Sequence, residues 1–145
     1  MSTPLDELRQ LADGKLPAPP IAALIGFTLS AVSPGEAVVE LAAGRQHANP
    51  MGTLHGGVLC DIADAAMGIA YASTPAEGES FVTVELKINF LKPVWTAKLR
   101  AIGRLVKRGK TMGFVECDIT DGHESLVARA SSTCMTLHGE QAHGR

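Results

Sequence analysis

Two carboxylates, Asp61 and Asp64, stand inside the apolar segment LHGGVLCDIADAAMGIAYAS, residues 54–73. An unpaired carboxylate in apolar surroundings is costly and tends to become protonated. At positions i and i+3 of a helix the two groups lie on nearly one face, and their repulsion raises the pKa of one of them, as acid/base chemistry requires. The spacing therefore predicts an acid/base site. A capping or interface ion pair is the alternative for either aspartate.

The tripeptide His55-Gly56-Gly57 precedes these acids, where loop becomes helix. Glycines at a helix start leave backbone N–H groups open to a ligand, and the helix dipole favours negative charge there. Gly56 and Gly57 are therefore candidates for holding a carbonyl oxygen that gains charge. The alternative is that the glycines only allow another backbone to approach closely.

A basic patch is predicted at one hairpin tip, formed by Arg104, Lys107, Arg108, Gly109 and Lys110. Such a patch can hold phosphate groups. A solvated sheet edge that resists aggregation is the alternative.

A metal site is a further hypothesis for the acidic region, whose candidate ligands are His47, His55, Asp61 and Asp64. Their spacing matches no compact motif such as His-Glu-x-x-His, so we expect no metal. The three cysteines include no C-x-x-C pair, and we expect buried free thiols.

The carboxylates and glycines are placed by a long helix, which is predicted over 54–73. Its residues are apolar on nearly every face, and this predicts that the helix is buried. A short helix is predicted for 4–12, and the proline-rich stretch 16–20 ends it. Two apolar runs within 23–43 flank Pro34-Gly35-Glu36 and predict a β-hairpin.

Strict alternation of apolar and polar residues over 82–90 predicts a strand with Thr83 on the face away from the helix. Three further strands are predicted at 96–107, 111–120 and 125–137, joined by turns at 108–110 and 121–123. A hairpin, a long helix and a four-stranded meander predict an α+β fold, in which an antiparallel sheet wraps around one helix.

The chain length of 145 residues predicts a single domain spanning residues 1–145, with 1–20 as a helical and proline-rich lead-in and 138–145 as a disordered tail. The net charge of −2 provides no basic field for nucleic acid and no polybasic arm for a membrane. The N-terminus lacks the apolar stretch of a signal peptide. We therefore expect a cytoplasmic protein that binds neither nucleic acid nor membrane.

The run HANPMGTLHGG at residues 47–57, followed by Asp64, resembles the hotdog-fold acyl-CoA thioesterases of the phenylacetate-pathway (PaaI-like) kind. The similarity covers roughly residues 20–137. It implies a hotdog fold and the hydrolysis of an acyl-CoA, with coenzyme A as part of the substrate and no separate cofactor.

The resemblance also implies roles for individual residues. Asp64 would be the nucleophile or general base, and the Gly56 amide would polarise the thioester carbonyl. Asn49 would lie beside the thioester, with His55 supporting the loop, and Thr83 matches a hydroxyl that positions water. Many relatives carry Glu where this chain has Asp64, and this shorter side chain leaves both chemical routes open.

Gly56 and Asp64 are eight residues apart, which is roughly 12 Å along one helix and too far for both to contact one carbonyl group. A two-fold dimer could bring Gly56 of one chain to Asp64 of the other. The resemblance likewise implies a site shared across a homodimer, paired again into a homotetramer.

Two other functions compete with hydrolysis. One is a hotdog module that binds an acyl-CoA without turning it over, and the other is hydration or dehydration of an acyl thioester. The retained Asp64 favours hydrolysis, and the histidine paired with a distant acid that a dehydratase needs is not evident. The acyl group stays open among short or medium aliphatic and aryl groups.

Overall fold

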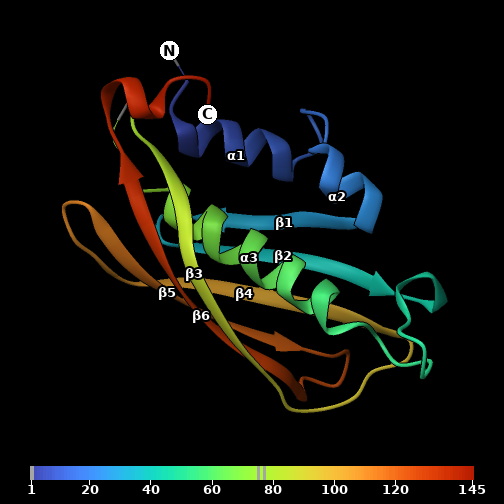
Figure 1. The fold of residues 1–145 in the computed structure, drawn as a ribbon. Coiled ribbons are helices and arrows are strands. Elements are labelled where there is room, and N and C mark those ends of the chain that lie inside the picture. The colour runs from blue at the N-terminus through green and yellow to red at the C-terminus, as the bar shows by residue number, and fades with distance from the viewer. Residues whose placement is uncertain (1, 75, 77) are drawn as a thin grey trace.

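A six-stranded antiparallel sheet dominates the computed structural model, which describes residues 2–74, 76 and 78–145. The sheet curves around one long helix, α3 (Gly56–Ala72), in the predicted hotdog arrangement (Figure 1). The strand order is β1-β2-β4-β5-β6-β3, so β1 and β3 form the two edges. The strands are β1 (Phe27–Ser33), β2 (Glu36–Ala43), β3 (Ser80–Phe90), β4 (Ala97–Arg108), β5 (Met112–Thr120) and β6 (Leu126–Leu137). The predicted hairpins and meander are confirmed.

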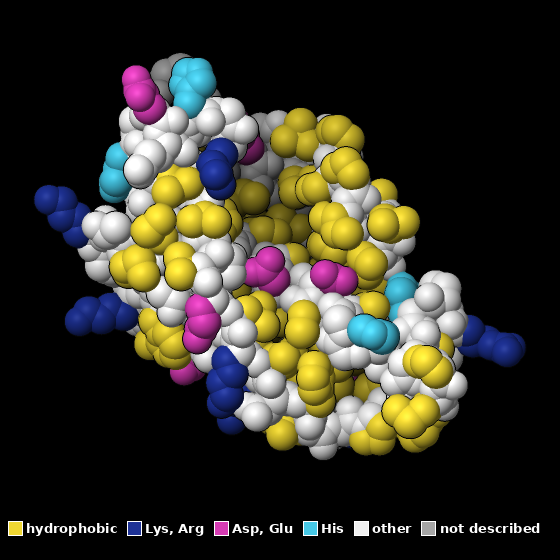
Figure 2. Space-filling view, viewed as in Figure 1, with side chains coloured by type: hydrophobic (Ala, Val, Ile, Leu, Met, Phe, Trp, Pro, Cys, Tyr) yellow, Lys and Arg dark blue, Asp and Glu magenta, His cyan; other side chains and the backbone are white. Residues whose placement is uncertain are grey.

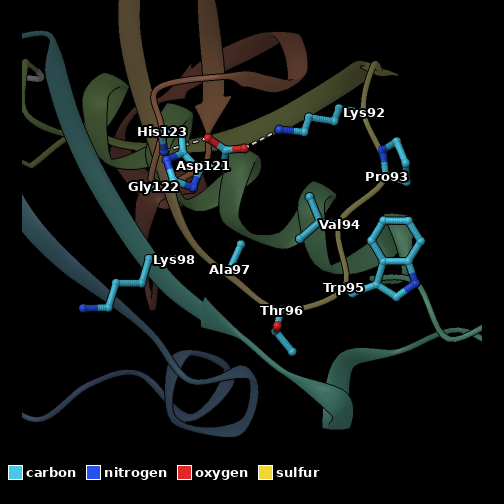
Figure 3. A pocket seen from close by; sticks show the side chains of 10 residues that line it. All are labelled: Lys92, Pro93, Val94, Trp95, Thr96, Ala97, Lys98, Asp121, Gly122 and His123. Carbon is cyan, nitrogen blue, oxygen red and sulfur yellow. Dashed lines mark hydrogen bonds and ion pairs between the residues drawn. The ribbon is translucent and has the colours of Figure 1, made fainter.

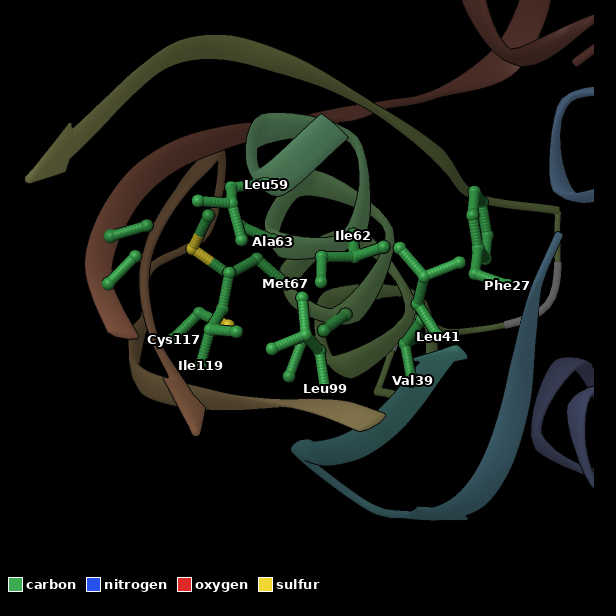
Figure 4. Packing of buried hydrophobic residues seen from close by; sticks show 14 of the residues in the cluster. Phe27, Val39, Leu41, Leu59, Ile62, Ala63, Met67, Leu99, Cys117 and Ile119 are labelled. Atoms are coloured by element: carbon green, nitrogen blue, oxygen red, sulfur yellow. The ribbon is translucent and has the colours of Figure 1, made fainter. Parts of the chain in front are cut away.

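The core lies between the concave face of the sheet and one side of α3. Ile62 and Met67 of the helix are fully buried, on the side of α3 that faces Leu41, Leu99 and Ile119 of the sheet (Figure 4). Strand β4 comes especially close, because a Cβ atom at Gly103 would collide with the carbonyl of Ala66. This position requires glycine for close approach rather than for backbone freedom.

The prediction that α3 is buried all round is wrong for one face. Leu59, Ile62 and Ala66 are buried against the sheet, whereas Asp61 is half-buried and Asp64 is exposed on the opposite face. The reason is that the sheet is open and covers a single side of the helix. The apolar residues that remain on the uncovered side are mostly small.

Strand β3 departs from the predicted alternation. Its pairing with β6 shifts between Thr83 and Glu85, which leaves Val84 as the extra residue of a β-bulge, 54% exposed. Because a bulge reverses which side chains face inward, Phe81 packs on α3 before it and Leu86 packs on the core after it. Thr83 consequently faces the helix, and its predicted orientation away from the helix is wrong.

The termini contain more structure than the sequence predicts. Helix α1 (Pro4–Ala12) is confirmed, with a capping box between Thr3 and Asp6. A second helix, α2 (Pro20–Ile25), replaces the expected start of the sheet. Residues 138–145, predicted as a disordered tail, include the 3-10 helix η2 (Gly139–Ala142), because backbone hydrogen bonds close turns there. Within the described residues, no helix is long and apolar enough to cross a membrane.

We predict that Gly103→Ala lowers the free energy of unfolding by about 1–3 kcal/mol, because the new methyl group must displace the backbone of α3. Gly122→Ala is the matched control, since a Cβ at that turn meets nothing within 4 Å and should change stability by less than about 0.5 kcal/mol. Urea unfolding followed by circular dichroism measures both. Equal midpoints would contradict the close packing of β4 on α3.

Candidate active site

The centre of the site is a hydrogen bond between α3 and β3. Thr83 Oγ1 donates to Asp64 Oδ1 at 3.0 Å. The β-bulge after Thr83 makes this contact possible, because it turns the hydroxyl toward the helix. The other carboxylate oxygen, Asp64 Oδ2, accepts no hydrogen bond from the part of the chain that the structure describes. One oxygen is therefore oriented, and the other is available to a ligand or to water.

Asp61 lies one turn before Asp64 on the same open face. Burial raises the pKa of its carboxyl, and the neighbouring charge of Asp64 raises it further, while His55 acts in the opposite direction. The predicted effect of paired carboxylates is thus seen at Asp61. Among the described residues, no group of three or more His, Cys, Asp or Glu side chains is arranged to hold a metal ion.

The N-terminus of α3 presents one open amide. His55 is the N-cap, and its Nδ1 accepts a hydrogen bond from Gly57 N at 2.8 Å. The N–H of Gly56 donates no hydrogen bond to any described residue. Of the two amides that the sequence offers, Gly56 is therefore free for a ligand, and Gly57 is used by the cap.

Phe90, at the end of β3, forms a wall beside this amide. A Cβ atom at Gly56 would lie 2.8 Å from Cζ of the Phe90 ring, so the aromatic ring covers the position that a side chain would occupy. The ring is 55% exposed. Phe90 is not among the candidates that the sequence pattern selects, and its one signal is a large aromatic residue at a strand end, close to Pro93.

Asn49 closes the loop that leads to Gly56. Its Oδ1 accepts hydrogen bonds from the backbone N–H groups of Met51 and Thr53, at 2.9 and 3.2 Å, and its Nδ2 donates to Thr53 Oγ1 at 2.7 Å. All three contacts are inside the loop, so Asn49 sets the loop's path. Its placement beside a thioester stays a prediction.

Arg108 does not join the predicted basic patch, because its guanidinium has partners inside the protein. The guanidinium of Arg108 lies 4.4 Å from the centre of the buried Tyr71 ring and donates to the hydroxyls of Thr74 and Thr136, at 3.0 and 3.1 Å. Glu79 lies 3.9 Å away and balances its charge. Gly109 and Lys110 are exposed in the turn. Arg108 thus has internal partners and is turned away from any ligand at the hairpin tip.

Hollows lie beside Gly56 and beside the acidic face of α3. A cavity of about 320 Å³ lies beside Gly56 and Phe90. On the open face of the molecule, hydrophobic side chains line a hollow next to the acidic side chains over α3 (Figure 2). An apolar cavity of about 230 Å³ lies where Leu11 of α1, Leu29 of β1 and Ile69 of α3 meet.

The chain belongs to the thioesterase superfamily, whose family model matches residues 51–128, and it is a thioester hydrolase. Its relatives include human acyl-coenzyme A thioesterase 13, which is 29% identical over 109 residues (74% of this chain and 77% of the relative). The 1,4-dihydroxy-2-naphthoyl-CoA hydrolase of Listeria monocytogenes is 30% identical over 109 residues (75% and 89%). The structure of the Escherichia coli PaaI protein, from the phenylacetic acid degradation operon, has the same fold, with a TM-score of 0.81 at 24% identity over 92% of this chain and 95% of that chain.

We predict that Arg108→Gln destabilises the protein by about 2–3 kcal/mol, because charged hydrogen bonds to two hydroxyls and the contact with Tyr71 are lost together. Lys110→Gln, at the exposed turn, should leave stability unchanged. Thermal unfolding of both variants measures the difference. Arg108 would be a surface residue after all if the two variants unfolded at the same temperature.

Proposed function

We propose that the protein hydrolyses acyl-CoA thioesters to the free acid and coenzyme A, with Asp64 as the catalytic carboxylate. The observation that carries this proposal is the Thr83–Asp64 hydrogen bond on the open face of α3. The printed names of the human and Listeria relatives, an acyl-CoA thioesterase and an acyl-CoA hydrolase, support the same substrate class.

The geometry accommodates two chemical routes. As a general base, Asp64 takes a proton from water while the water oxygen bonds to the thioester carbon; the carbon–sulfur bond then breaks, and the thiolate takes up a proton. As a nucleophile, a carboxylate oxygen of Asp64 displaces the thiolate to form an anhydride, which water hydrolyses. In both routes the Gly56 N–H stabilises the oxyanion of the tetrahedral intermediate.

Thr83 contributes orientation in either route. A hydrogen bond to one carboxylate oxygen fixes the plane of the group and directs the other oxygen to the reacting atoms. Asp61, with its raised pKa, reduces the negative charge next to Asp64 whenever it holds a proton. We assign Asp61 a supporting role only.

Each chain carries two halves of a site, and we propose that a homodimer joins them. Gly56 and Phe90 form one half, and Asp64 and Thr83 form the other, so the same strand β3 takes part in both. β3 is an edge strand of 11 residues with exposed apolar side chains, which is the kind of edge that pairs with another strand. Antiparallel pairing of two β3 strands, with Thr83 opposite the partner copy of Phe90, brings a carboxylate to an open amide.

The alternative function is a hotdog module that binds an acyl-CoA without hydrolysing it. The cavities serve such a module equally well. The oriented carboxylate favours catalysis, because a binding module has no need for an acid held with one free oxygen. A cytoplasmic location and the pairing of dimers into a homotetramer stay predictions.

We predict that Asp64→Asn lowers kcat by at least about 100-fold, because the amide keeps the shape and the contact region of the carboxylate but cannot accept a proton or attack the thioester. Asp61→Asn is the matched control and should cost much less. Steady-state hydrolysis of several acyl-CoAs, followed by thiol release, measures both, with sizing and circular dichroism to verify folding. A near wild-type kcat for Asp64→Asn, or an inactive Asp61→Asn, would show that the catalytic acid is wrongly assigned.

We predict that Gly56→Pro lowers kcat by about 100-fold or more, because it removes the amide hydrogen that holds the oxyanion. Proline suits the first position of a helix, and His55 before it already has an extended backbone. Gly56→Ala is the control, since it adds the same Cβ against Phe90 and keeps the N–H.

The same two variants test whether the active site is shared between the two chains of a dimer. Hybrid dimers of one Asp64→Asn chain and one Gly56→Pro chain, isolated by two different affinity tags, should regain activity because one of their two sites is intact. Each variant paired with itself should remain inactive. Inactive hybrids of verified composition would rule out a site that crosses chains.

A further inference from the structure

The cavity beside Gly56 has a neighbour along the β3–β4 connection. It shares Lys92, Pro93 and Val94 with a neighbouring cavity of about 410 Å³. This second cavity lies between the β3–β4 connection and the turn at 121–123. The two cavities are therefore neighbours along the chain segment that follows β3, and a long substrate whose thioester meets Gly56 could reach the second cavity across these three residues.

The walls of the second cavity combine an aromatic face with basic side chains. Trp95 stands on one side, Lys98 and His123 on the other, and Val94 and Ala97 lie between them (Figure 3). Trp95 is 59% exposed, which is unusual for the largest apolar side chain unless it meets a partner. In the part of the chain that the structure describes, no carboxylate forms an ion pair with Lys98.

The negative charge of Asp121, the acid that lines this cavity, is already compensated by an ion pair. Asp121 forms an ion pair with Lys92, at 2.5 Å, and accepts hydrogen bonds from the backbone N–H groups of His123 and Ser125, at 2.9 and 3.0 Å. These donors lower the pKa of the Asp121 carboxyl to about 2. The carboxylate thus serves to shape the turn, and the uncompensated charge at the cavity is the positive charge of Lys98.

We propose that this cavity binds the nucleotide end of the acyl-CoA substrate, a 3′-phosphorylated adenosine diphosphate. The adenine stacks on Trp95, and the phosphates lie toward Lys98, while the flexible pantetheine arm follows the shared residues Lys92–Val94 to Gly56. An aromatic face next to basic side chains is the combination that recognises a phosphorylated base. The proposal rests on the proposed function and assigns the nucleotide to a site other than the hairpin at 108–110.

The chain has a single tryptophan, so its fluorescence reports on this cavity alone. Free coenzyme A and adenosine 3′,5′-bisphosphate should both change the emission of Trp95, saturating with concentration. Pantetheine, which lacks the nucleotide, should not. Coenzyme A that binds by calorimetry without changing the emission would overturn the proposal.

Steady-state kinetics distinguish a loss of nucleotide binding from a loss of catalysis. Trp95→Leu and Lys98→Gln should each raise KM for an acyl-CoA by about tenfold, the loss expected for one stacking or phosphate contact, with kcat unchanged. Neither should alter hydrolysis of the corresponding acyl-pantetheine. Lys15→Gln, at an exposed lysine in the N-terminal segment, is the matched control and should behave as wild type.

The experiments distinguish a failure of the nucleotide-site proposal from a failure of the proposed function. If the wild type hydrolyses acyl-CoA but the Trp95 and Lys98 variants keep its KM, or if Lys110→Gln raises KM instead, the nucleotide lies elsewhere and this proposal falls while the function stands. If the wild type hydrolyses neither acyl-CoA nor acyl-pantetheine, the proposed function falls, and the fluorescence titration still decides whether the cavity binds a nucleotide.

Discussion

One-sided packing of the sheet on α3 is the constraint on which the rest of the structure depends. A strand without a side chain at Gly103 lets the sheet lie directly on the helix backbone, and Ile62 and Met67 of α3 are fully buried in the core. Hydrophobic burial against the sheet therefore leaves the part of the opposite face that carries Asp61 and Asp64 open. Asp64 is exposed there and avoids the desolvation cost that a fully enclosed helix would impose, whereas the half-buried Asp61 bears part of that cost.

Much of the architecture could be predicted from sequence because its signals are local. The meander strands follow from alternation interrupted by glycine-containing turns, and α3 follows from a long segment of good helix formers. Helix α2 was missed because six residues that begin with Pro20 carry too short a pattern to detect. The bulge at Val84 was missed because one inserted residue leaves the alternating sequence unchanged and alters only which face each side chain occupies.

The residues of the candidate site also differ in whether their sequence signals are local or depend on partners that are distant in sequence. Asp64, Gly56 and His55 belong to one stretch of sequence, and its resemblance to the PaaI-like thioesterases selects them as candidates. Arg108 was wrongly grouped with Lys110, because the partners that turn it inward, Tyr71 and Thr136, are far away in sequence. Phe90 and Trp95 are conspicuous only once the fold shows that they are exposed beside the cavities.

Helix α3 is also fastened at both ends. His55 caps its first turn, and at its last turn Tyr71 is joined to Thr136 of β6 and covered by Arg108. A helix held in this way cannot slide along its axis, so Gly56 and Asp64 both keep their places relative to the sheet. The N-terminal helices border the apolar cavity and carry none of the proposed catalytic groups, so a substitution there can reshape that cavity while α3 keeps its place.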